Sequence, residues 1–233
     1  MKFWLILITC AHLTYAQLDS VETATQFWLD FNPIYPIDQQ WTVYGDGGYR
    51  LIFGNKDFHR LYIRSAGSYQ LDETFILHAG LGLFTTIDEQ STLWEFRPFQ
   101  GLEIRWPKIF TIPLFQYIRF EERFFNKNSV SSFILRGRYQ LSTNIRFNKN
   151  KIQKYFFVPL QLEWFVNLGN DIDFHANEFR AIAGIGYVFD LIWRADFNII
   201  YENLRTSADE KLALNDIILR LRIYKGFNPL FIK

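Results

Sequence analysis

Cysteine is almost absent from this chain of 233 residues, and its one copy, Cys10, lies near the N-terminus. A single cysteine excludes a disulfide framework and a metal site built from several thiolates. An excess of charge of one sign is lacking too, because 25 Lys and Arg stand against 24 Asp and Glu and leave a formal net charge of +1. The chain also has no nucleotide-binding or nucleic-acid motif. We therefore predict no nucleic-acid partner and no cofactor.

Long hydrophobic runs are missing as well. The N-terminal apolar stretch, residues 3–11, is well short of the ~20 residues that a spanning helix needs. It follows Lys2 and precedes Thr14-Tyr15-Ala16, which puts small residues at the two positions that a signal peptidase reads. We predict a cleaved signal peptide over residues 1–16, with cleavage before Gln17, and one domain over residues 17–233. The alternative for the apolar stretch is a membrane anchor.

Aromatic residues are abundant, at 19% of the chain, and the apolar pattern has a period of two. Residues 133–147 show it most clearly, because one phase holds Phe133, Leu135 and Leu141. The other phase of the same segment holds Arg136 and Arg138. Such alternation is typical of strands with two chemically different faces. After residue 17 no segment has a convincing helical stripe, so the sequence predicts an all-β protein.

Turn residues divide the alternating pattern into eleven segments. These segments cover residues 21–34, 39–53, 57–71, 75–87, 91–106, 109–125, 130–147, 151–167, 177–189, 191–204 and 212–225. Single-chain bacterial barrels have even strand counts. We therefore predict a closed antiparallel up-and-down transmembrane β-barrel with about twelve strands, and ten strands is the alternative count.

The transmembrane part of this prediction concerns which face of the sheet points inward. A soluble barrel or sandwich buries its apolar face, whereas a membrane barrel turns that face to lipid. Several segments exceed the ~5–6 residues of ordinary strands, and Arg with Glu or Asp lies at mid-strand, which suits a confined wet lumen. Aromatic rings near segment ends suit headgroup depth: Trp41, Trp94, Trp106, Tyr155, Trp193, Tyr201 and Tyr224.

These features predict a protein of the bacterial outer membrane. Its surroundings would be the lipid bilayer and lipopolysaccharide, and the barrel-assembly machinery would be its partner during insertion. The alternative is a soluble periplasmic β-protein.

The polar phase of the strands forms what we name the charged ladder. Its members are Glu95, Arg97, Glu103, Arg105, Arg119, Glu121, Arg123, Arg136, Arg138, Glu163, Arg180, Arg194, Asp196, Arg220 and Arg222. Antiparallel neighbours sit ~5 Å apart across a sheet, so we expect these side chains to interdigitate on the lumen wall. They are either a pairing network that fills and stiffens a narrow barrel or a lining for a small anionic solute.

The middle of the chain carries Glu95-Phe96-Arg97-Pro98-Phe99-Gln100, then residues 119–124 (RFEERF) and 135–139 (LRGRY). Residues 177–180 (NEFR) are followed by residues 184–187 (GIGY). In order and spacing these motifs resemble an uncharacterised bacterial outer-membrane β-barrel family, classed only as a domain of unknown function. The resemblance implies a barrel in the outer membrane, and it brings no activity.

Three roles stay open at this point. The first is a small channel or transport barrel, or a purely structural one. The second is an accessory subunit that binds another outer-membrane protein through the expected loops 168–176 and 205–211. The third is a lipid-acting enzyme, for which Ser65 or Ser68 with His78 is the best candidate pair. His59, His78 and His175 have no metal-ligand spacing, so we predict no metal site and no catalytic residue.

Overall fold

The computed structural model describes residues 23–89, 91–109, 112–127, 130–147, 154–168, 176–205 and 213–227. Within these ranges the chain forms eleven strands and no helix. Cys10, the predicted signal peptide and His175 lie outside the described residues, as do residues 169–175 and 206–211 of the expected loops 168–176 and 205–211.

The strands follow the segments that alternation predicts, with their ends displaced by a few residues. They are β1 (Thr23–Pro36), β2 (Trp41–Ile52), β3 (Asn55–Gln70), β4 (Phe75–Asp88), β5 (Ser91–Ile109), β6 (Ile112–Lys127), β7 (Val130–Arg146), β8 (Tyr155–Leu168), β9 (Ala176–Val188), β10 (Trp193–Arg205) and β11 (Ala213–Gly226).

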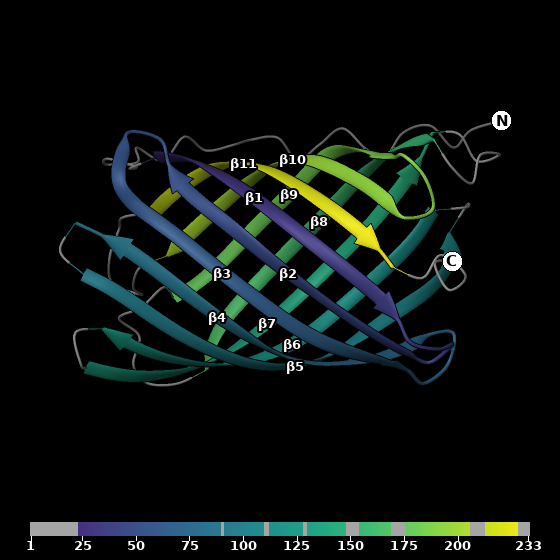
Figure 1. Cartoon of the computed structure of the whole chain (residues 1–233), viewed down its shortest axis with the longest axis horizontal. Coiled ribbons are helices and arrows are strands. Elements are labelled where there is room, and N and C mark those ends of the chain that lie inside the picture. The colour runs from purple at the N-terminus through teal and green to yellow at the C-terminus, as the bar shows by residue number, and fades with distance from the viewer. Residues whose placement is uncertain are drawn as a thin grey trace, which may run out of the picture.

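The strands close into one barrel, in which each strand pairs with its neighbours along the chain and β1 also pairs with β11 (Figure 1). Every pair of consecutive strands is antiparallel, but the pair that closes the barrel is parallel, with Leu29 opposite Leu221. The all-β closed barrel is thereby confirmed. Its described strands number eleven, not twelve or ten, and its pairing is mixed. In an up-and-down sheet with an odd strand count, the first and last strands point the same way, so the closing pair has to be parallel.

The two faces of the barrel wall differ sharply in polarity. Every strand exposes at least one large apolar side chain on the outside, such as Leu81 on β4 and Phe197 on β10. Neighbouring residues on one strand show the contrast, because Ile199 is 55% exposed whereas Ile200 is 0% exposed. The buried side chains therefore lie inside the barrel and not between two layers.

The aromatic residues at strand ends divide between the two faces. Trp41, Trp94, Trp106 and Trp193 are exposed apolar groups of the outer face, as the sequence predicts for a belt of rings. Tyr224 differs, because it lines the internal cavity. Aromatic type alone therefore does not fix which face a residue occupies.

Candidate functional site in the barrel lumen

The charged ladder lies on the inner wall of the barrel. Eight of its members are buried, although all carry ionisable side chains: Glu95, Arg97, Arg119, Glu121, Arg123, Arg136, Glu163 and Asp196. Buried charges at this density need partners, because an unpaired ion in a low-dielectric interior is costly.

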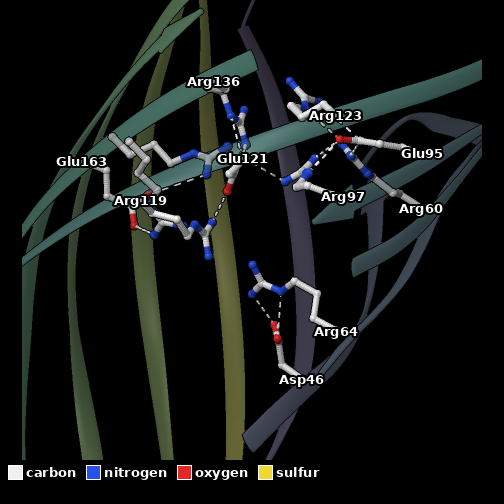
Figure 2. Close-up of polar contacts among 12 residues, drawn as sticks. Asp46, Arg60, Arg64, Glu95, Arg97, Arg119, Glu121, Arg123, Arg136 and Glu163 are labelled. Carbon is white, nitrogen blue, oxygen red and sulfur yellow. Dashed lines mark hydrogen bonds and ion pairs between the residues drawn. The ribbon is translucent and has the colours of Figure 1, made fainter. Parts of the chain in front are cut away.

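Glu95 on β5 is the first centre of pairing. Its carboxylate accepts hydrogen bonds from Arg97 Nε at 2.7 Å, from Arg123 Nε at 2.7 Å and from Arg60 Nη2 at 3.1 Å. Figure 2 shows these three guanidinium groups, from β3, β5 and β6, converging on one carboxylate. Three guanidinium groups therefore share the single negative charge of this carboxylate.

Glu121 on β6 is the second centre, and it is completely buried. Arg136 lies directly opposite it on β7 and donates to Oε2 from Nε at 2.8 Å and from Nη2 at 2.6 Å. Arg119 also pairs with Glu121, and Arg97 Nη1 lies 3.6 Å from Oε2. Arg97 therefore joins the two centres into one network (Figure 2).

Further charged pairs lie around the wall, and here fewer arginines surround each carboxylate. Glu163 on β8 pairs with Arg138 and lies 3.6 Å from Arg180, and Arg180 Nε lies 3.0 Å from Glu202 Oε2. Arg222 Nε donates to Asp196 at 2.9 Å across β10 and β11. Here each carboxylate has one or two guanidinium partners among the described residues.

Some charged side chains of the inner wall escaped the sequence analysis, among them Asp30, Asp46, Arg50, Arg60, Arg64 and Glu202. Arg64 holds Asp46 with two hydrogen bonds, at 2.8 and 2.5 Å, and Asp30 accepts from Tyr62 at 2.5 Å and pairs with Arg220. The period-two pattern marks them all, because they share a phase with other inward residues. A consistent use of that phase across the first three segments, and at Glu202 in the tenth, would have found them.

Two ladder residues depart from the enclosed ion pairing of the others. Arg105 is 45% exposed and pairs with Glu103 at 2.8 Å, close to the end of β5. Arg194 has no ion pair to a described residue, and its guanidinium carbon lies 4.0 Å from the centroid of the Tyr224 ring. Neither side chain lines the internal cavity.

Aromatic rings fill the space between the charges. Arg97 lies 4.1 Å from the Phe84 ring centroid, and Arg136 lies 4.7 Å from that of Phe165. Arginine stacks on aromatic faces more readily than lysine. These contacts explain why the inner wall uses arginine, since each guanidinium gains a flat apolar neighbour as well as a carboxylate.

One part of the inner wall is apolar. Ile182, Ile200 and Ile218 lie directly opposite one another on β9, β10 and β11, and with Trp28 they form a buried cluster. The sequence analysis missed this cluster, because the isoleucines occupy the phase that otherwise carries Asp196, Asn198 and Glu202. We name these four residues the isoleucine row.

A cavity of about 740 Å³ occupies the lumen. Its lining runs along β1 from Gln26, near the start of the strand, to Ile34, near its end. The cavity is lined by eleven arginines but only five acidic residues, because Glu95, Glu121 and Asp30 lie behind the side chains that cover them. A solute inside the lumen would therefore meet a wall with an excess of positive charge.

His78 does not form the serine pair considered from the sequence. Its Nδ1 shares a 2.8 Å hydrogen bond with Tyr44 Oη, and its Nε2 lies 3.6 Å from Glu103. Ser68 lies opposite His78 in the register, but its hydroxyl donates to the Thr42 carbonyl at 3.5 Å. Ser65 follows the outward phase of β3. The described contacts thus show no activated serine.

No helix among the described residues is long and apolar enough to cross a membrane. In the same part of the chain, no three His, Cys, Asp or Glu residues come together as metal ligands.

Fold and site together define a closed β-barrel protein with an arginine-rich interior. The chain belongs to the family described as "Protein of unknown function (DUF2490)", whose model matches residues 25–213. Comparison with curated proteins and with solved structures found no match. Membership of an uncharacterised family, which the motifs indicate, is confirmed. The outer-membrane part of the resemblance stays a prediction.

Proposed function

We propose that this protein spans the bacterial outer membrane as a β-barrel and that its lumen is a narrow, anion-preferring channel. The observation that carries the proposal is the cavity along the barrel interior, lined by eleven arginines and five acidic residues. Rings of arginine or lysine favour anions in pores.

The outer wall supports the membrane location. Its strands are 12 to 19 residues long, whereas ~9–11 residues of a tilted strand suffice to cross the hydrocarbon. Large apolar side chains are exposed on every strand. Soluble monomers seldom expose continuous apolar patches beyond a few hundred Å², so a surface of this kind fits lipid better than water.

The size of the barrel supports a narrow channel. Eleven strands enclose far less space than the 16–18 strands of a porin. The stacked arginines and aromatic rings fill part of that space. The lumen therefore suits small anions and excludes the free diffusion of large solutes.

The experiment is single-channel recording of the refolded full-length protein in planar bilayers under a KCl gradient. We expect small conductance steps and a reversal potential that shows chloride preference over potassium. Arg138→Gln should lower that preference, because Arg138 lines the cavity. Arg105→Gln, outside the lining, is the matched control. Correctly folded protein without conductance steps would reject the channel.

A separate test addresses the membrane location. Leu81 is 54% exposed in the middle of β4, and Leu81→Arg should destabilise a lipid-embedded barrel by ~2–4 kcal/mol near the bilayer midplane. A soluble barrel would tolerate arginine at an exposed site. Unfolding in vesicles reports the difference, and an unchanged stability would contradict the membrane location.

One observation favours a second role, that of a closed structural barrel. Glu121 is fully buried and pairs with Arg97, Arg119 and Arg136 from three adjacent strands of the wall. Such a network stiffens a narrow barrel whether or not ions pass. Absent conductance together with a folded, vesicle-inserted protein would favour this role.

A further inference from the structure

Two like charges face each other on the inner wall. Arg50 on β2 lies directly opposite Arg60 on β3. Like charges that face each other across two strands are destabilising, so a native pair of this kind calls for a counterion. Arg60 has one, because its Nη2 reaches Glu95 at 3.1 Å.

Arg50 makes no salt bridge with a described residue, and Asp30, the carboxylate whose charge attracts it, is paired with Arg220. Its guanidinium carbon lies 3.7 Å from the centroid of the Trp28 ring, and its Nε is buried without a hydrogen-bond partner. Stacking on indole holds the plane of the guanidinium in place but satisfies none of its N–H donors. Buried donors without partners are rare in native proteins, and this one belongs to a side chain that lines the cavity.

Neighbouring arginines also have buried N–H donors without hydrogen-bond partners. Arg60 Nε and Arg123 Nη1 are also buried without a hydrogen-bond partner. Both side chains share Glu95 with Arg97. This part of the wall therefore holds several guanidinium groups around one carboxylate, and Arg50, Arg60 and Arg123 all line the cavity.

We propose that Arg50, Arg60 and Arg123 form a binding site for an oxyanion group, a phosphate or a carboxylate, inside the lumen. The forked donors of arginine match the oxygen geometry of both groups. An oxyanion would supply the missing negative charge and accept hydrogen bonds from the unsatisfied donors. The inference rests on the water-accessible lumen of the proposed function, but it does not require conduction.

Apolar side chains flank this site within the same cavity. Ile52 follows Arg50 by two residues, Phe58 precedes Arg60 by two, and Leu93 precedes Glu95 by two, so each shares the inward phase of its neighbour. All three line the cavity. An anion with a short alkyl tail could therefore bind its oxygens at the arginines and its tail at this flank. Free phosphate and an alkyl phosphate share the headgroup chemistry and differ only in the tail.

The test is isothermal titration calorimetry on the refolded full-length protein in nanodiscs, with inorganic phosphate and hexyl phosphate as probes. We expect both to bind, and Arg50→Gln to weaken each by tenfold or more. Arg194→Gln is a matched control, because Arg194 also stacks on an aromatic ring without an ion pair to the described chain but lies outside the cavity lining. Hexanol controls for partition into lipid.

Arg50→Lys is a second variant in case Arg50→Gln does not fold. It keeps the charge and loses the fork, and we expect a smaller but measurable loss of affinity. No binding of either probe to the wild type, or equal losses in Arg50→Gln and Arg194→Gln, would overturn the site. Tighter binding of hexyl phosphate that is lost in Phe58→Ser would indicate an alkyl-bearing ligand, and equal affinities would indicate the free anion. A barrel that binds phosphate but shows no conductance would keep the site and reject the channel.

Discussion

Two parts of the lumen wall differ in the partners that their buried side chains have. On β9, β10, β11 and β1, the isoleucine row is buried and apolar, and Asp196 and Asp30 each have one arginine salt-bridge partner among the described residues. On β5, β6 and β7, Glu95 and Glu121 are shared among five arginines. The first part resembles the core of an ordinary protein. The second surrounds two carboxylates with an excess of arginines next to a cavity, an arrangement that suits ligand binding more than stability.

Glu121→Gln tests the second region and should have the largest effect. It removes the only described carboxylate that pairs with Arg119 and Arg136, and breaking a buried pair in this way typically costs ~3–5 kcal/mol. Urea unfolding of the refolded barrel measures the loss. Glu122→Gln on the opposite face of the same strand is the control. Equal losses of stability in the two variants would show that the shared carboxylate contributes no more to stability than a carboxylate on the opposite face.

Ile200→Ala tests the first region. Ile200 is completely buried in the isoleucine row, and removing its outer atoms should cost ~2–5 kcal/mol. Ile199→Ala, on the exposed face, should cost less in the same unfolding experiment. If Ile199→Ala proved the more damaging of the two, the assignment of inner and outer faces would be reversed.

Asp196→Asn sharpens the comparison between one-to-one and shared carboxylates. Asp196 accepts from Arg222 at 2.9 Å and from Asn198 at 2.6 Å. Asparagine keeps one acceptor and removes the charge from a single arginine, so we expect a loss of ~1–3 kcal/mol. A loss as large as that of Glu121→Gln would remove the distinction between the two regions.

Arg105→Gln should have the smallest effect. Arg105 is nearly half exposed in its pair with Glu103, and exposed pairs contribute only ~0–1 kcal/mol. The midpoint of urea unfolding should barely move. A large shift would mean that the end of β5 is more enclosed than its exposure indicates.

The fold could be predicted from the sequence to the level of individual strands, because outward apolar and inward polar residues alternate so clearly. Division of the sequence at turn residues already gave eleven strands. The rule that such barrels have even strand counts then led to the wrong prediction of twelve or ten. An odd number of strands can close a barrel when the first and last strands pair in parallel, as β1 and β11 do.

The site was less predictable. Phase locates a side chain on a face, but its partner depends on register and on reach across the lumen. Arg50 and Arg60 lie in different segments, and only the observed register places them opposite each other. Arg60 then reaches past β4 to Glu95, a contact that no local pattern encodes. The isoleucine row was hidden because apolar residues interrupt a polar phase.

The parallel seam between β1 and β11 has a topological consequence. The polypeptide enters the cylinder at Thr23 on one rim and leaves it at Gly226 on the other, whereas an even-stranded barrel returns its two ends to the same rim. The partners at the seam are about 190 residues apart in the chain, with Gln26 opposite Ile218, and no hairpin brings them together. Closing the barrel at this seam is therefore the strand pairing with the greatest loop-closure entropy to overcome.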